Sequence, residues 1–381
     1  MRFITDEKFE FLLQFLQERQ IDILLISDFE DSENINLQYL SGHPTDAFVL
    51  ITSSGESILI PWDVALAKKH SEVDELVDYS NFKYNMFLVM KDLFEKRWKK
   101  ATITIGTHES IPYGFIVRMK ALISGVKFYK EPIQISRFLG ELRATKSEIE
   151  IKQLKIAAQI GTKTIREIRN FCENTPNGTE KELSFLIRKK MADYGADDVA
   201  FEPLVANSSR AHELHQYPYA SDQKFSLPGL ALIDFGAKYQ GYNSDITVPI
   251  SFGKLSNEQI KMNNLTIKAY EAAIEMIDLD VPLWKVHDRV EQILKKEGFS
   301  MPYALGHGLG LTVHDSPIIS RKPTDEYSLK HWKEERFQEG MVFTIEPSVF
   351  KQGLGGQRLE NDFLIWNGKV EVITHSKYIK V

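Results

Sequence analysis

The chain has 381 residues, of which 43% are hydrophobic and 26% are charged, and its formal net charge is −6. This length allows two domains, and a mildly acidic charge gives no reason to expect nucleic acid or an anionic membrane as a partner. The single cysteine, Cys172, excludes an intrachain disulfide, which fits a reducing compartment. The N-terminal stretch lacks a long apolar run, and no segment reaches the ~18 consecutive apolar residues of a membrane span. We therefore expect a cytoplasmic protein.

The first third of the chain alternates helical and strand patterns. Apolar residues at helical spacing predict a helix over 5–20. Helical stretches also fall near 85–99 and 112–123, and short apolar runs predict strands at 21–26, 47–52, 57–60, 101–105 and 126–129. Such alternation is typical of an α/β layered domain, which we place at residues 1–131. Its polar residues show no catalytic spacing.

Residues 132–145 are expected to link this domain to a second one over residues 146–381. Capping boxes at Thr179 and Ser256 each mark the start of a helix. The chain repeats one order, two helices and then strands, over residues 146–250 and 256–366. This repeat predicts one domain of two related halves, with a site between them.

The stretch from Leu232 to Val248 consists of two apolar runs around a short polar segment that contains Gly241. This pattern is typical of a β-hairpin. A loop at 238–241 would place Asp234 directly opposite Asp245, with Cβ atoms roughly 5 Å apart. Carboxylates that close repel each other unless a cation lies between them, one of them stays protonated, or a bulge separates them.

Three stretches of the second half carry further candidate residues. A glycine-rich segment holds His307 and His314, whose odd spacing would put them on opposite faces of a flat strand. Its glycines suggest close backbone approach to a ligand or a neighbouring strand. An apolar strand ends in Glu346, and a carboxylate there is costly unless it is paired or metal-bound. Arg358 and Glu360 share one face of a later strand.

Together these stretches supply two Asp, one or two His and two Glu, all on extended segments. Oxygen-rich ligation with an imidazole suits Mn²⁺, Fe²⁺, Co²⁺ or Zn²⁺. Four carboxylates would balance two divalent ions, and a bridging hydroxide would complete a hydrolytic centre with two metals.

The order of these motifs resembles that of the pita-bread metallopeptidases. The motifs are Asp-Phe-Gly with Ser-Asp-Ile-Thr, Gly-His-Gly-Leu-Gly with Val-His-Asp, Thr-Ile-Glu-Pro, and Arg-Leu-Glu-Asn-Asp, over about residues 200–366. The two-domain layout is similar to the proline-specific branch, the Xaa-Pro aminopeptidases and prolidases, and Tyr39-Leu-Ser-Gly42 matches a recurrent stretch of their N-terminal domain. The resemblance implies an α/β, creatinase-like N-terminal domain and an α+β pita-bread catalytic domain with a pseudo-twofold repeat.

The resemblance also implies a metal ligand set. Asp234 would hold one metal, Asp245 and Glu360 would bridge both metals, and His307 and Glu346 would hold the second. The cofactors would be two divalent ions, Mn²⁺ first, with Co²⁺, Fe²⁺ or Zn²⁺ as alternatives.

Four residues are implied to serve catalysis. Glu346 would act as general base, His215 matches a histidine that contacts substrate, and His314 matches one near the scissile carbonyl. Arg358 would orient the carboxylates, because its donors form a planar fork.

The implied activity is a dinuclear exopeptidase that cleaves the bond after an N-terminal residue preceding proline. Some dipeptide-cleaving relatives use an Arg shortly after the Val-His-Asp motif, where this chain has Ile318, with Arg321 three residues on. This favours an aminopeptidase over the alternative of an Xaa-Pro dipeptidase (prolidase). A non-catalytic peptide- or protein-binding module of the same fold is an alternative from another class, although such modules generally have eroded ligands. Creatinase shares the fold but not the ligand set. A homodimer is expected by resemblance only.

Three positions depart from the family pattern. Ser348 follows Glu-Pro where Gly is usual, Tyr303 stands where many relatives have His, and Asn361 replaces a common Asp after the bridging Glu. None of the three removes a metal ligand.

Overall fold

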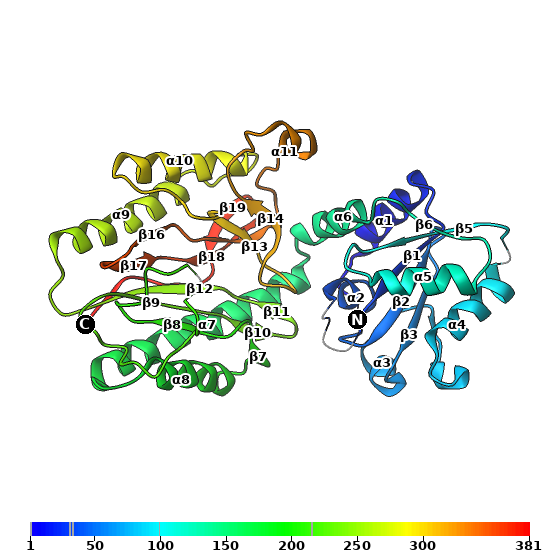
Figure 1. Cartoon of the computed structure of the whole chain (residues 1–381), viewed down its shortest axis with the longest axis horizontal. Helices are drawn as coiled ribbons and strands as arrows, with labels where there is room; N and C mark the ends of the chain where they lie inside the picture. The colour runs from blue at the N-terminus through cyan, green and yellow to red at the C-terminus, as the bar shows by residue number, and fades with distance from the viewer. Residues whose placement is uncertain (1, 30–31, 33, 99, 215) are drawn as a thin grey trace. The chain divides into compact units, whose positions relative to one another are not determined.

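The structure is a computed structural model, and it describes residues 2–29, 32, 34–98, 100–214 and 216–381. The chain forms two compact units, Met1–Leu142 and Arg143–Val381 (Figure 1). The expected division at 131 and 145 stays a prediction, and residues 132–144 form a helix. No helix in the described ranges is long and apolar enough to cross a membrane.

The first unit is built on a six-stranded sheet in the order β4-β3-β2-β1-β5-β6. Strand β1 runs antiparallel to β2 and parallel to β5. The strands are β1 (Ile23–Ser27), β2 (Ala47–Thr52), β3 (Ser57–Pro61), β4 (Glu75–Leu76), β5 (Ile103–Thr107) and β6 (Val126–Phe128). The helices are α1 (Asp6–Glu18), α2 (Ile35–Ser41), α3 (Val64–His70), α4 (Met86–Asp92), α5 (Tyr113–Leu122) and α6 (Pro132–Ala144). This confirms the α/β architecture predicted for the first third of the chain.

The central strands of this sheet are continuous apolar runs because both of their faces are covered. Every residue of β1, β2 and β3 is buried. Helix α1 buries Leu12 and Leu16, which recur at helical spacing, and Thr5 caps its first turn by accepting a hydrogen bond from the Lys8 amide. The helix predicted over 5–20 is therefore confirmed.

The helices of the second unit follow the predicted repeat. They are α7 (Glu148–Asn174), α8 (Glu180–Asp193), α9 (Asn257–Ile274), α10 (Leu283–Lys296) and a short α11 (Glu326–His331). The capping boxes predicted at Thr179 and Ser256 both form, and Ser147 adds a third at the start of α7. Helices α7 and α8 lie on one side of the strands and α9 and α10 on the other (Figure 1).

Within the described residues, the strands of this unit form three sheets, in the orders β11-β10-β7, β16-β17-β9-β12-β20 with β8 beside β9, and β14-β13-β15-β18-β19. The strands are β7 (Asp198–Val199), β8 (Leu204–Ala206), β9 (Gly229–Phe235), β10 (Ala237–Tyr239), β11 (Tyr242–Asn243), β12 (Ile246–Phe252), β13 (Gly306–Gly308), β14 (Asp315–Ile319), β15 (Val342–Ile345), β16 (Ser348–Lys351), β17 (Gly355–Arg358), β18 (Asn361–Trp366), β19 (Lys369–Val372) and β20 (Ile379–Lys380).

Each half of this unit has its own hydrophobic core. One packs α7 and α8 against β9 and β12, and the other packs α9 and α10 against β14, β15 and β18. Strands from both halves meet in one sheet, because β17 of the second half lies beside β9 of the first. That pairing brings polar residues of β9 and β17 close together.

Candidate metal centre

The hairpin that carries the two aspartates forms, but its register differs from the prediction. Tyr239 pairs with Tyr242 around a loop of two residues, Gln240 and Gly241, both with positive φ. A two-residue loop of this kind suits the twist of antiparallel strands. It moves each predicted partner by two residues, so Asp234 lies opposite Thr247 and not opposite Asp245.

The two aspartates nevertheless remain close. Asp245 precedes Thr247 by two residues, which keeps it on the same side of the hairpin as Asp234. The strands approach so tightly beside them that a Cβ on Gly236 would lie 1.9 Å from the Ser244 carbonyl oxygen. The hairpin prediction is confirmed and the predicted direct opposition is wrong, but the two carboxyl groups still interact, since the charge of Asp234 helps to raise the pKa of Asp245.

His307 and two acids form the centre of the cluster. Ligand atoms of Asp245, His307 and Glu360 all lie within 4.8 Å of one another. His307 Nε2 is 3.6 Å from Asp245 Oδ2 and 3.5 Å from Glu346 Oε1. Its Nδ1 lies 3.2 Å from the Gly308 carbonyl oxygen, so Nδ1–H donates there and Nε2 keeps its lone pair for the cluster.

Close backbone contacts place these ligands. His307 lies in β13 between Gly306 and Gly308, where an added Cβ would lie 2.0 Å from the carbonyl oxygens of Thr344 and Ser316 respectively. This confirms the expectation that the glycines mark close approach of a neighbouring strand. Glu346 directly follows β15, and Glu360 occupies the short gap between β17 and β18.

The electrostatics of the cluster call for positive charge. Burial, followed by the charges of Glu360 and Asp234, raises the pKa of Asp245 well above its usual value. Burial and then Glu360 raise the pKa of Glu346 in the same way, and burial with Asp234 raises that of Glu360 to about 7. Acids packed this closely are costly without cations.

Two of the acids also carry an oxygen that the protein does not satisfy. Asp234 Oδ1 and Asp245 Oδ1 are buried and have no hydrogen-bond partner within the described structure. Buried polar atoms are almost always paired. Unpaired carboxylate oxygens beside a free imidazole nitrogen fit divalent cations, which such a donor set prefers.

Arg358 connects the acids of the two halves. Its Nη2 contacts Asp234 Oδ2, its Nε donates to Thr247 Oγ1 at 2.8 Å, and its Nη1 donates to Tyr303 OH at 3.1 Å. Thr247 Oγ1 in turn donates to Glu360 Oε2 at 2.6 Å. Arg358 therefore holds Asp234 directly and Glu360 through a hydroxyl.

Sequence reasoning missed Thr247 and the role of Tyr303. Thr247 could have been found, because it lies two residues after Asp245 and thus shares its strand face. Tyr303 stood out only as a departure from the family pattern, and no spacing could indicate its contacts with Ser348 and Arg358, which lie far along the chain.

The predicted histidines have different outcomes. His314 follows a bend after β13, and its ring centroid lies 4.3 Å from that of His307. The expectation of opposite faces is wrong, because the chain leaves the strand after Gly308. His314 is exposed and lines the same cavity. His215 lies outside the described residues.

Two of the departures from the family pattern touch each other. Tyr303 OH and Ser348 Oγ form a hydrogen bond, and Ser348 Oγ also donates to the Glu346 carbonyl at 3.1 Å. The third, Asn361, is fully engaged elsewhere: its Nδ2 donates to Tyr270 OH and its Oδ1 accepts from the Ser376 amide. Asn361 is therefore a structural residue beside the cluster.

The cluster opens into a cavity of about 740 Å³. Its lining includes all five predicted ligands with Arg358 and His314, and also the apolar residues Phe201, Leu204, Leu214, Val313 and Ile318. This volume is in the range of small-molecule sites. A short peptide therefore fits beside the acids.

The first unit is an α/β domain, and the second has two repeated halves with a buried cluster of acids and an imidazole. These features define a two-domain metallohydrolase of the creatinase and pita-bread type. Residues 152–367 match the metallopeptidase family M24, and residues 9–144 match the creatinase/prolidase N-terminal domain. The chain belongs to metallopeptidase family M24, which confirms the predicted family, fold and hydrolase class.

Relatives with known names match over nearly the whole chain. A Xaa-Pro dipeptidase of Pyrococcus horikoshii is 29% identical over 366 residues, 95% of each protein, and one of Pyrococcus furiosus is 27% identical over 97% of this chain and 98% of its own. The prolidase structure from P. horikoshii superposes with a TM-score of 0.81 at 27% identity, covering 98% of this chain and 99% of that one. An X-Pro aminopeptidase structure from Thermotoga maritima gives 0.79 at 26% identity, covering 96% and 99%.

Proposed function

We propose that this protein is a dinuclear metal-dependent exopeptidase that hydrolyses the bond between an N-terminal residue and proline. The observation that carries the proposal is the cluster of four acids and one imidazole in a peptide-sized cavity, with unpaired oxygens on Asp234 and Asp245. The relatives named as Xaa-Pro dipeptidases and as X-Pro aminopeptidase support the substrate class.

The proposed ligands are the five residues that the family resemblance implies, and their gathering around one cavity supports them. Asp234, Asp245, His307, Glu346 and Glu360 would hold the two ions. When bound, two divalent ions would lower the pKa of water and polarise the scissile carbonyl. We expect Mn²⁺ first, with Co²⁺, Fe²⁺ and Zn²⁺ as alternatives.

The protein's own groups would carry the proton and orient the substrate. Glu346 accepts the proton of the attacking water and returns it to the leaving proline nitrogen. His314, exposed at the cavity beside His307, donates to the scissile carbonyl oxygen as negative charge develops there. Arg358 and Thr247 hold the carboxylates in position. The role of His215 in contacting substrate stays a prediction.

The cavity lining favours peptides longer than two residues. Ile318 lines the cavity and is 46% exposed. Among the described lining residues, Arg358 is the only Lys or Arg, and its donors are taken by Asp234, Thr247 and Tyr303. The carboxylate of a dipeptide would therefore meet no uncommitted Lys or Arg among the described lining residues, so we propose an aminopeptidase.

A dipeptidase is the second candidate, because two relatives that match nearly the full chain carry that name. The test is hydrolysis of matched peptides such as Leu-Pro, Leu-Pro-Gly and Leu-Gly-Gly with Mn²⁺ added. We expect cleavage of Leu-Pro-Gly, weak cleavage of Leu-Pro and none of Leu-Gly-Gly. Cleavage of Leu-Pro alone would reverse the order of the two candidates.

Metal analysis tests the centre independently of substrate choice. We expect two divalent ions per chain in purified protein, whereas the docking-module alternative predicts neither metal nor hydrolysis. The expected homodimer is tested by light scattering, in which a monomer mass would reject it. The cytoplasmic location also stays a prediction.

A further inference from the structure

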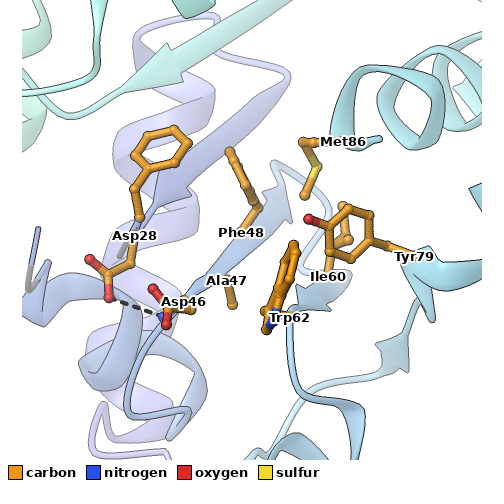
Figure 2. A pocket seen from close by; sticks show the side chains of 9 residues that line it. Asp28, Asp46, Ala47, Phe48, Ile60, Trp62, Tyr79 and Met86 are labelled. Atoms are coloured by element: carbon orange, nitrogen blue, oxygen red, sulfur yellow. Dashed lines mark hydrogen bonds between the residues drawn. The ribbon is translucent and has the colours of Figure 1, made fainter. Parts of the chain in front are cut away.

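The first unit contains a pocket of about 450 Å³ that the proposed peptidase reaction does not use. It lies at one end of the β2–β3 pair, where the Trp62 amide donates to the Asp46 carbonyl at 2.9 Å. Figure 2 shows Asp28 and Asp46 on one side and Trp62, Tyr79 and Met86 on the other, with Phe48 between them. Paired strands are rigid, so the opposed walls of the pocket are held in place.

One wall is aromatic and open to solvent. The ring centroid of Trp62 lies 5.6 Å from that of Tyr79 and 5.7 Å from that of Tyr84, and the two tyrosine centroids are 5.6 Å apart. Trp62 is 61% exposed and Tyr84 is 60% exposed. Large aromatic side chains clustered at the surface mark a contact site more often than single exposed ones do.

The opposite wall carries two carboxyl groups. Asp28 is buried, and its oxygens accept from the Asn34 amide at 2.8 Å and the Asp46 amide at 3.3 Å. Asp46 Oδ1 is buried and has no hydrogen-bond partner in the described part of the chain. Both residues line the pocket, so this wall carries the acceptors that a cationic ligand needs.

No basic side chain of the described residues forms an ion pair with Asp28 or Asp46. His43 lies near Asp46, but burial lowers its pKa, so its imidazole is neutral at neutral pH. The acid wall therefore lacks a protein cation, while aromatic faces opposite it also attract positive charge.

We propose that this pocket binds an organic ammonium ion. The ammonium group would lie between the carboxyl groups of Asp28 and Asp46, and the apolar body would pack on Trp62 and Tyr79. A carboxylate accepts a charge-assisted hydrogen bond, and the volume suits a small ligand. A neutral apolar ligand would make no use of the two carboxyl groups, and a bare metal ion would make no use of the aromatic wall.

The probe is 2-phenylethylammonium, titrated into the full-length protein by calorimetry, with 2-phenylethanol as a neutral molecule of similar size. We expect the ammonium compound to bind and the alcohol to bind about tenfold more weakly. Asp46→Asn should weaken the ammonium compound about tenfold and the alcohol little. Asp46 has a φ of 42°, which Asn tolerates, so this variant should fold.

Trp62→Leu should weaken ammonium binding about threefold, since it removes one aromatic face. Matched controls in the same unit are Glu72→Gln and Tyr113→Leu, which change an exposed acid and a side chain that is 79% exposed outside the pocket. Neither control should alter binding. The proposal is overturned if the wild-type protein does not bind the probe, if the alcohol binds equally well, or if Asp46→Asn leaves the affinity unchanged. Peptide hydrolysis plays no part in this readout.

Discussion

The two halves of the second unit share one order of elements but contribute different side chains to the candidate centre. The first half, with α7 and α8, supplies Asp234 and Asp245 from a hairpin, and each keeps an unpaired buried oxygen. The second half, with α9 and α10, supplies acids as well but adds the imidazole of His307 and the guanidinium of Arg358.

This difference shows that neither half balances the charges of its own acids. Within the described residues, the cation that contacts Asp234 is Arg358 of the second half. Thr247 of the first half accepts a hydrogen bond from Arg358 and donates one to Glu360. A repeated pattern of elements thus builds a common frame, while single side chains that cross between the halves balance the charge. Four variants and treatments test this comparison.

Removing the proposed base of the second half should have the largest effect. Glu346→Gln should lower kcat about a thousandfold, because a general base contributes roughly 10²–10⁴-fold and a proposed ligand is lost as well. The fold should persist, since the change relieves repulsion with Glu360. Glu271→Gln, on the exposed face of α9, is the matched control. Near wild-type turnover of Glu346→Gln would refute the role of Glu346.

The second-largest effect is expected from changing Arg358, which links the acids of the two halves. Arg358→Lys keeps the charge but loses the planar fork that reaches Asp234, Thr247 and Tyr303 together. We expect activity or metal affinity to fall about 10- to 100-fold, as is typical when a partner of metal ligands is lost. Arg336→Lys, which alters an exposed ion pair, should change neither. If both lysine variants behaved alike, Arg358 would not be the link between the halves.

Metal removal should expose the repulsion among the acids as a pH dependence of stability. The pKa of Glu360 is raised from 4.5 to about 7, so the metal-free folded state binds protons that the unfolded state releases. This contribution is present in full below the unfolded pKa and is lost as pH rises through the folded value. After chelation, Tm should be about 5 °C lower at pH 7.5 than at pH 5.5, and added Mn²⁺ should restore it at pH 7.5. A metal-free Tm that rises over this interval would contradict the charge argument.

The smallest effect is expected from changing Tyr303 and Ser348, the two residues that depart from the family pattern and share a hydrogen bond. Tyr303→Phe removes a hydroxyl that bonds Ser348 and accepts from Arg358, so it should reduce stability by about 1 kcal/mol and activity a few-fold. Ser348→Ala should cost a similar amount. Because the two hydroxyls share a hydrogen bond, the double variant should be less destabilised than the sum of the single variants. Strict additivity in denaturant unfolding would mean that the two residues act independently.

Several features of the centre could be predicted from local patterns. The capping boxes at Thr179 and Ser256 mark helix starts through contacts within one turn, and the apolar runs mark buried strands. The motif order pointed to Asp234, Asp245, His307, Glu346 and Glu360, and the structure brings all five to one cavity. Such predictions succeed because they depend on spacing between near neighbours or on residue types.

The errors have a common cause in longer-range geometry. The register of the hairpin depends on the positive φ of Gln240, a conformation unusual for a residue other than glycine. His314 reaches His307 because the chain bends after β13. In the first unit, Trp62 and Tyr79 had no catalytic spacing, yet the fold sets them opposite Asp46.

The sequence by itself determined the order of elements and the chemical identity of the acids and the imidazole, since these follow from residue type and local periodicity, and it indicated the family through the resemblance of its motifs. The tertiary structure alone decided that Arg358 would cross to Asp234, that Tyr303 would meet Ser348, and which carboxylate oxygens would be left for a cation. The reason is physical: a buried polar atom is satisfied or left unpaired by whatever packing brings to within about 3 Å of it, and no spacing along the chain specifies that distance.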